Sequence, residues 1–211
     1  MKEMLKQRTK KIITKLKKLY PDSQCSLYYN DPFQLLIATQ LSAQCTDERV
    51  NKVTPALFDK YQTVEDFAKA DLQTLQSLIH STGFYKNKAR NIQNCARQIL
   101  EKYHGQVPNQ LEDLIMLDGV GRKTANVVLG NAFGMPGLVV DTHVTRLTNR
   151  LKLTHQKDTV KIEFAMMEII PKKDWSVFAH LMINHGRKIC KARTPLCKDC
   201  GISQWCPSKN I

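Results

Sequence analysis

Four cysteines near the end of the sequence have the spacing of a metal centre. They follow the pattern C-x6-C-x2-C-x5-C within 17 residues. Thiolates this close together, in a chain without a secretory signal, indicate metal binding rather than disulfide bonds. Structural zinc sites usually use two separated CxxC-like pairs, and only one occurs here, so the spacing favours an iron–sulfur cluster and leaves zinc as the alternative. The expected ligands are Cys190, Cys197, Cys200 and Cys206.

A second candidate site is the segment LDGVGRKTANVV, in which two glycines lie between two expected helices. Glycine permits positive φ and close backbone approach, and the helix that follows presents unpaired N–H groups that can bind a phosphate. An ordinary helix–turn–helix corner is the alternative, but the basic surroundings favour a sequence-independent grip on DNA. The expected DNA contacts in this segment are Gly119, Val120, Gly121 and Arg122.

Lys123 follows this loop in the first turn of the expected helix, where the positive helix end disfavours a lysine. A lysine nucleophile must be neutral, and bringing a lysine from its reference pKa of about 10.4 to about 7.5 requires about 4 kcal/mol. A helix terminus supplies only about 0.3–1 kcal/mol. Desolvation by bound DNA would therefore have to supply most of the rest. A solvated or phosphate-pairing lysine is the alternative.

Asp141 precedes another helical run, in VVDTHVTRL. It can cap that helix, which stabilises by about 1 kcal/mol. It can also serve acid–base chemistry beside Lys123, by taking up protons or offsetting positive charge on the sugar. An ionised aspartate raises a nearby lysine pKa, so Asp141 cannot be what makes the amine neutral.

The charge of the chain suits a polyanion. It has 32 basic and 19 acidic residues, a net charge of +13, and both ends are strongly basic. Residues 1–20 hold eight Lys or Arg against one acidic residue, and residues 186–211 hold six against one. We see no signal peptide and no apolar run of roughly 18 residues. We therefore expect a cytoplasmic protein that binds a polyanion, either nucleic acid or an anionic membrane surface.

The hydrophobic pattern is helical nearly throughout, and strand-like alternation is absent. A hydrophobic fraction of 42% is enough for a buried core. The sequence therefore predicts an all-α fold. Pro21 ends the first helix, Asp31-Pro32 opens the second, and Asp47 caps the third. The other expected helices are Val64–Ala70, Leu72–Ile79, Lys86–Tyr103, Leu111–Leu117, Lys123–Phe133, Thr142–Leu151, Val160–Ile170 and Trp175–Ile189.

The segments from Leu117 to Arg150 and from His185 to Cys206 closely resemble the bacterial endonuclease III family of the helix-hairpin-helix DNA glycosylase superfamily. LLIATQLSAQCTDERVN and STGFYKNKARNI extend the likeness over most of the chain. The resemblance implies two helical domains flanking a DNA-binding cleft. One is a six-helix bundle at 25–135 with the hairpin. The other joins 1–24 to 136–211 and holds a [4Fe–4S] cluster in 190–206.

The resemblance also implies a bifunctional glycosylase and AP lyase that acts on oxidised pyrimidines in double-stranded DNA. Lys123 would attack C1′, expel the base and form a Schiff base, and β-elimination would then break the strand 3′ to the abasic site. Asp141 matches the family's second catalytic residue. The damaged nucleotide must leave the stack to be reached. The resemblance further implies that the protein is bacterial and nucleoid-associated and acts on DNA as a monomer.

Four more residues match family positions near the extruded nucleotide. Gln44 matches the residue that fills the vacated space, although it could be a polar helix-end residue. Phe84 matches the opposite-strand wedge, where the family often has leucine, although it could be a core anchor. Asp47 and His143 match positions near the pocket, and His143 could instead cap or pack.

Three other readings remain open. An adenine-mismatch glycosylase of the same superfamily would use activated water and carry no lysine at the hairpin position; the length of 211 residues also leaves no room for its C-terminal recognition domain. A non-catalytic DNA-binding module would use the hairpin as a phosphate clamp. A zinc-stabilised scaffold would be distinguished by metal analysis.

Overall fold

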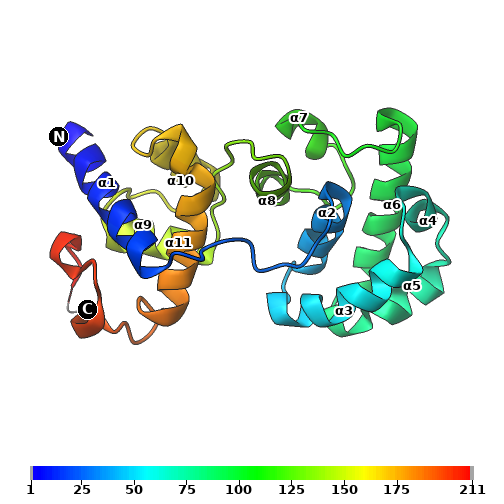
Figure 1. The fold of residues 1–211 in the computed structure, drawn as a ribbon, viewed down its shortest axis with the longest axis horizontal. Helices are drawn as coiled ribbons and strands as arrows, with labels where there is room; N and C mark the ends of the chain where they lie inside the picture. The colour runs from blue at the N-terminus through cyan, green and yellow to red at the C-terminus, as the bar shows by residue number, and fades with distance from the viewer. Residues whose placement is uncertain (1, 210–211) are drawn as a thin grey trace. The chain divides into compact units, whose positions relative to one another are not determined.

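The computed structural model describes residues 2–209, which form helices joined by turns and loops, without a β-strand in that range (Figure 1). The all-α fold expected from the hydrophobic pattern is confirmed. The chain divides into two compact units. The central unit is Cys25–Met135, and the terminal unit joins Met1–Gln24 to Pro136–Ile211. No helix among the described residues is both long and apolar enough to cross a membrane.

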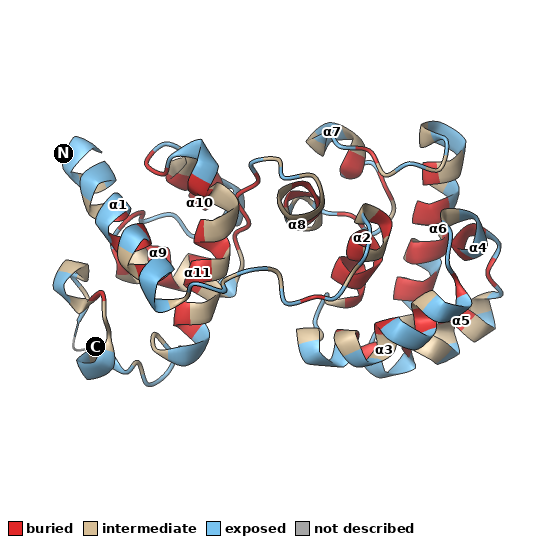
Figure 2. Cartoon of the chain, in the orientation of Figure 1, coloured by how far each residue is buried: buried red, intermediate tan, exposed pale blue. Residues whose placement is uncertain are grey.

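The central unit is built around α2 (Pro32–Leu41) and α6 (Tyr85–Tyr103). All but two residues of α2 are buried, as expected for a helix that is apolar on every side (Figure 2). The long α6 is instead amphipathic, and its buried face packs against two short helices and α2. The remaining elements are α3 (Asp47–Lys60), α4 (Val64–Lys69), α5 (Leu72–Ile79), η1 (His80–Thr82), α7 (Leu111–Leu114) and α8 (Arg122–Ala132).

In the terminal unit, helices from both ends of the sequence pack together. The first helix, α1 (Lys2–Leu19), buries Ile12, Ile13 and Leu16 and contacts α11 (Trp175–Lys188). That helix also packs on α9 (Thr142–Arg150). The unit is completed by α10 (Thr159–Met167), η2 (Lys172–Asp174), η3 (Cys197–Asp199) and η4 (Ser203–Trp205).

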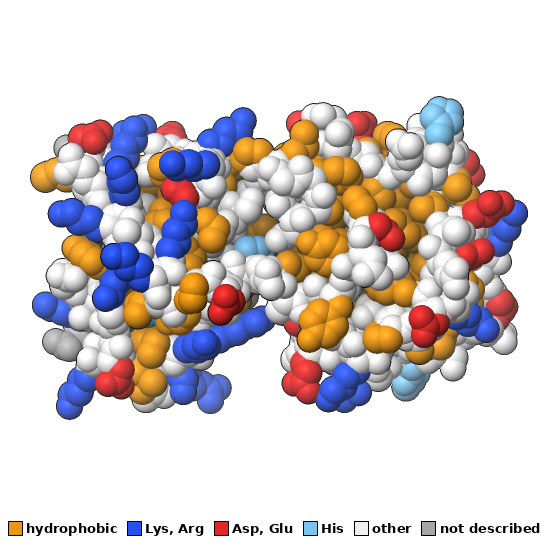
Figure 3. Space-filling model, in the orientation of Figure 1, with side chains coloured by type: hydrophobic (Ala, Val, Ile, Leu, Met, Phe, Trp, Pro, Cys, Tyr) orange, Lys and Arg blue, Asp and Glu red, His pale blue; other side chains and the backbone are white. Residues whose placement is uncertain are grey.

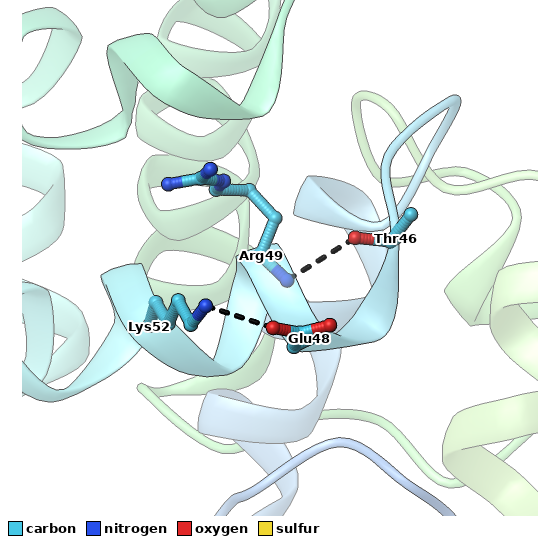
Figure 4. A network of polar contacts seen from close by, with 4 residues as sticks. All are labelled: Thr46, Glu48, Arg49 and Lys52. Atoms are coloured by element: carbon cyan, nitrogen blue, oxygen red, sulfur yellow. Dashed lines mark hydrogen bonds and ion pairs between the residues drawn. The ribbon is translucent and has the colours of Figure 1, made fainter.

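Side-chain caps fix several helix starts, and one expected cap is wrong. Asp31 accepts a hydrogen bond from the Gln34 amide, with Pro32 at the first helical position, as predicted. In α3 the cap is Thr46 rather than Asp47, because the Thr46 hydroxyl accepts from the Arg49 amide at 3.2 Å (Figure 4).

Two acidic residues follow Thr46 in the first turn of α3. Asp47 accepts a 2.6 Å hydrogen bond from Ser26 Oγ. Glu48 pairs with Lys52 one turn on, at 2.8 Å (Figure 4). The hydrogen bond from Lys52 lowers the pKa of Glu48. Both carboxylates complement the positive helix end, so Asp47 supports this terminus without capping it.

Candidate functional site

The glycine loop forms a tight hairpin between α7 and α8. The helix expected to run to Leu117 ends at Leu114, and the chain turns through hydrogen bonds from the Leu117 amide to Leu114 O and from the Val120 amide to Leu117 O. The Ala125 amide then bonds to Gly121 O and begins the ladder of α8. The expected pair of helices around a glycine loop is therefore confirmed, with a shorter first helix.

Asp118 fixes this hairpin to the bundle. Its carboxylate accepts hydrogen bonds from Asn94 Nδ2 at 2.9 Å and Gln98 Nε2 at 3.1 Å, both on α6. Its amide donates to Gln98 Oε1 at 2.8 Å, and its carbonyl oxygen lies 3.4 Å from Gln40 Nε2 on α2. Two helices of the core therefore hold the loop rigid, which is the preorganisation a binding loop needs.

The backbone conformation and the packing require glycine at one of the two glycine positions of the loop but not at the other. Gly119 has φ +74°, and a Cβ there would lie 2.9 Å from Asn91 Cβ and 3.0 Å from Gln40 Oε1. Glycine is therefore required at 119 by both conformation and packing. Gly121 has φ −88°, and nothing lies within 4 Å of where its Cβ would be. The fold does not require glycine at 121, so the open space there is available to a ligand.

The N-terminus of α8 faces solvent with Lys123 as its second residue. Lys123 is exposed and Arg122 is half-buried, whereas the Val120 side chain is buried, so a contact from Val120 to DNA would have to come from its backbone. Gly121 caps the helix without a side-chain hydrogen bond. The start of α8 therefore has no side-chain cap, and a helix N-terminus of this kind can bind an anion.

Gln44 and Phe84 both adopt left-handed backbone conformations. Their φ angles are +54° and +48°, in a region that non-glycine side chains rarely occupy. Both side chains are exposed, Phe84 by 64%, so Phe84 is not a core anchor. Strained backbone of this kind concentrates at functional sites, where the surrounding structure holds it in place.

A buried lysine joins the two loops that carry these residues. Lys88, on α6, is 7% exposed, and its Nζ donates to Leu41 O at 2.7 Å and to Thr82 O at 2.8 Å. Leu41 lies three residues before Gln44, and Thr82 lies two before Phe84. Burial lowers the pKa of Lys88. Such a cation is retained inside a protein only with compensating partners, and here they are the carbonyls beneath the two exposed side chains.

In the terminal unit, Asp141 is the N-cap of α9, as predicted. Its Oδ1 accepts from the Val144 amide at 2.8 Å, and its side chain is half-buried. His143, on the same helix, lies against α11: its Nδ1 is 3.1 Å from Arg146 Nη2, and a Cβ on Gly186 would be 2.6 Å from it. His143 therefore packs between α9 and α11, which is one of the roles considered for it from the sequence.

The four cysteines of the C-terminal pattern line one pocket, with residues from α9 and α11 on its other sides. Among residues 2–209, no three His, Cys, Asp or Glu side chains converge closely enough to hold a single metal ion. Four thiol side chains lining one pocket are a donor set that either a zinc ion or an iron–sulfur cluster can use. Burial raises the pKa of Cys200 and Cys206, and repulsion between the negative charges of neighbouring thiolates is a further cause. A metal centre bound to these sulfur atoms would offset the cost of the thiolate form.

Two side chains donate toward the sulfur atoms. His185 is buried, with Nδ1 2.9 Å from Tyr20 Oη and Nε2 3.5 Å from Cys200 Sγ. Burial lowers the pKa of His185 to about 4. The neutral ring satisfies both contacts when Nε2–H donates to sulfur and Nδ1 accepts from the tyrosine. Arg150 Nη1 donates to Cys190 Sγ at 3.4 Å, and hydrogen bonds to sulfur of this kind orient cluster ligands.

Arg150 and Arg146 also tie α9 to the cysteine loop, the segment 190–206 that carries the four cysteines. Arg150 donates to Lys191 O and to Ala192 O, both at 2.7 Å. Arg146 donates to Cys190 O at 3.1 Å from Nη2. The helix that Asp141 caps is thus fixed at its far end to the cysteine loop.

Lys88, Asp118, Arg146, Arg150 and His185 were not predicted as site residues. The sequence does contain a signal for three of them. Arg146 and Arg150 lie four positions apart on one helix, and Asp118 lies within the segment LDGVGRKTANVV. No signal was present for Lys88, which looks like any helix-surface lysine in the sequence.

The chain also matches known proteins. Residues 37–172 match the family model described as HhH-GPD superfamily base excision DNA repair protein. The chain belongs to this superfamily, and within it to the endonuclease III family. Endonuclease III of Synechocystis sp. is 55% identical over 204 residues, covering 96% of this chain and 93% of that protein. Endonuclease III of Bacillus subtilis is 46% identical, covering 92% and 89%.

Solved structures of this family match over nearly the full length. A non-covalent endonuclease III–DNA complex and a trapped endonuclease III–DNA covalent intermediate each have a TM-score of 0.92 and 46% identity. In both comparisons the match covers 97% of this chain and 96% of the other. The resemblance noted from the sequence is confirmed.

Proposed function

We propose that this chain is a bifunctional DNA glycosylase and AP lyase that removes oxidised pyrimidines from double-stranded DNA in base excision repair. The observation that carries the proposal is that Lys123, the second residue of α8, is exposed next to a rigid hairpin at a helix start that has no side-chain cap. The relative trapped as a DNA covalent intermediate supports the covalent step. Lys123 disfavours the alternative of an adenine-mismatch glycosylase, because such an enzyme would carry no lysine at this position of the hairpin.

In the proposed reaction, Lys123 Nζ forms a bond to C1′ of the extruded nucleotide as the bond from C1′ to the base breaks. Protonation of the departing base and opening of the sugar leave a Schiff base. Removal of a proton from C2′ then breaks the C3′–O bond, and the 3′ phosphate leaves. Because Lys123 is exposed, the neutral amine this needs would depend on DNA excluding water from it.

The other site residues would hold the DNA. The hairpin backbone at Gly119–Gly121 would bind a phosphate, and Gln44 and Phe84 would occupy the space left by the extruded nucleotide. Asp141 would take up protons or offset charge on the sugar. His143 would act mainly through its packing between α9 and α11.

The four cysteines would hold a [4Fe–4S] cluster. Bound there, the cluster would supply a rigid tie between α9 and the C-terminal loop, and His185 and Arg150 would orient its ligands. Analysis of the purified protein should find about four iron and about four acid-labile sulfide per chain. A colourless protein with about one zinc per chain would contradict this assignment.

An excision assay over a panel of duplexes tests the proposal. The panel includes ring-saturated and fragmented pyrimidines, uracil, an oxidised purine and a plain abasic site. We expect excision of the oxidised pyrimidines and strand cleavage at the abasic site, without added metal. Excision without strand cleavage would indicate a monofunctional enzyme. Binding without either reaction would indicate a non-catalytic module.

A further inference from the structure

The terminal unit has an open groove that the proposed reaction does not use. It lies between α1 and the last turn of the cysteine loop and has a volume of about 540 Å³. Many basic side chains lie among other side chains on the part of the molecule that holds α1 (Figure 3). The groove is lined by Gln7, Lys10, Lys11, Thr14, Lys15, Lys18 and Trp205.

The two walls of the groove are held together by direct contacts. Arg8 Nη1 lies 3.5 Å from Trp205 O, and Arg8 Nη2 donates to Leu151 O at 2.9 Å. Further along α1, a Cβ on Gly201 would lie 2.8 Å from Leu19 Cδ1, so helix and loop touch there as well. These contacts hold the backbone of Trp205 beside α1, and Trp205 lines the groove together with the lysines.

The lining of the groove carries positive charge only. None of its residues is acidic, and within residues 2–209 none of its four lysines forms an ion pair. By contrast, Lys17 pairs with Asp174 at 2.6 Å. From Lys10 to Lys18 the helix rises about 12 Å, so the charges form a row that a run of phosphates can follow. A row of unpaired lysines attracts a polyanion.

Two features select among polyanions. The apolar face of α1 is buried in the unit at Ile12, Ile13 and Leu16. The exposed large apolar side chains of the helix are Met4 and Leu19, which lie near its opposite ends and do not form the continuous apolar face that inserts into a lipid surface. Trp205 adds an aromatic ring on which an unpaired base can stack. The carboxylate side chains of an acidic peptide have no ring that could stack there. Bases within a duplex are already stacked. A basic groove with an aromatic platform is the arrangement that binds single-stranded nucleic acid.

We propose that this groove is a second nucleic-acid site, which binds single-stranded DNA through phosphate contacts to the lysines of α1 and stacking of a base on Trp205. It would hold an unpaired segment while duplex DNA occupies the catalytic site.

The test measures binding of an eight-nucleotide oligothymidine, a length within the range of about 4–16 nucleotides for such sites. The groove variant replaces the four lysines by alanine, which favours helix at exposed positions. A control variant removes the same charge from exposed lysines of the central unit. The groove variant is Lys10→Ala, Lys11→Ala, Lys15→Ala and Lys18→Ala; the control is Lys52→Ala, Lys60→Ala, Lys69→Ala and Lys102→Ala.

We expect the groove variant to bind the oligonucleotide at least tenfold more weakly, while the control binds like the parent. Each phosphate contact contributes about 0.7 to the salt slope of single-strand binding, so losing two to four contacts should reduce that slope by about 1.4 to 2.8. Excision from duplex DNA should be unchanged in the groove variant, which separates this site from the proposed catalytic one.

Stacking is tested by fluorescence. The chain has two tryptophans, so Trp175→Phe leaves Trp205 as the sole indole. We expect the oligonucleotide to quench its emission, and polyglutamate of equal charge to leave it unchanged. Equal binding by the groove and control variants, an emission that stays constant at saturation, or equal competition by polyglutamate or by anionic vesicles would overturn the proposal.

Discussion

Lys88→Met tests whether the buried lysine positions the two exposed side chains of the central unit. Methionine keeps most of the length of the lysine side chain but removes its charge and the two hydrogen bonds that Nζ donates. In the parent, Nζ bonds to Leu41 O and Thr82 O, directly beneath the turns that carry Gln44 and Phe84. Without these bonds, the two turns lose the link that the Lys88 side chain makes between them, and their strained backbones lose a shared support.

The size of the effect follows from the two carbonyls. Each buried acceptor that loses its partner costs about 1–3 kcal/mol, and removing the buried charge recovers part of this. We therefore expect the free energy of unfolding to fall by about 2–3 kcal/mol. Gln93→Met is the matched control, because Gln93 is also buried on α6 and donates to a carbonyl, Ala70 O at 2.6 Å, away from these turns.

Activity is compared at a temperature where both variants are folded, as checked by urea unfolding. If Lys88 positions the extrusion residues, Lys88→Met should lose excision of a stacked lesion by about tenfold or more. Cleavage at a preformed abasic site, which costs less to extrude, should fall less. Gln93→Met should keep both activities. Equal losses in the two variants, or equal losses on the two substrates, would refute a positioning role and leave Lys88 as a stability residue only.

Three further predictions follow from single positions. Phe84→Ala should leave the free energy of unfolding within about 0.5 kcal/mol, since the ring is exposed, but should weaken lesion excision at least tenfold in single-turnover assays. Gly119→Ala should lower the free energy of unfolding by about 2–3 kcal/mol in urea titrations, because of its positive φ and its contact with Asn91, whereas Gly121→Ala should unfold like the parent. Burial lowers the pKa of Lys88, so in the alkaline range below the reference lysine pKa the unfolded chain binds more protons there than the folded chain. The free energy of unfolding of the parent relative to Lys88→Met should therefore rise with pH as the pH approaches the reference lysine pKa of about 10.4, and a flat or falling difference would contradict this assignment.

The helices and their order could be read from the sequence because apolar periodicity and local caps are short-range signals. Asp141 at the start of α9 is such a case, since its cap involves residues three positions apart. The same locality explains the error at α3, where Thr46 and Asp47 are both good caps and only the backbone turn decides between them. Local pattern also misplaced the end of α7, which stops at Leu114.

The supports of the site could not be read in this way, because they join residues far apart in the chain. Lys88 contacts Leu41 across 47 positions, and Arg150 contacts Cys190 across 40. The left-handed backbones of Gln44 and Phe84 are equally hidden, since neither is a residue type that favours positive φ. The chemistry of Lys123 came from the family likeness, since helix placement alone is too weak to make a lysine a nucleophile.

The most direct test of the catalytic proposal is borohydride trapping on DNA with an abasic site. The parent should form a covalent complex, and digestion and mass spectrometry should locate the sugar adduct on Lys123. Lys123→Ala, which removes an exposed side chain and should fold normally, should form no adduct and cleave at least a thousandfold more slowly, about 4 kcal/mol in activation free energy. Trapping and cleavage by Lys123→Ala at the parental level, or an adduct on another residue, would contradict the assignment of Lys123 as the nucleophile.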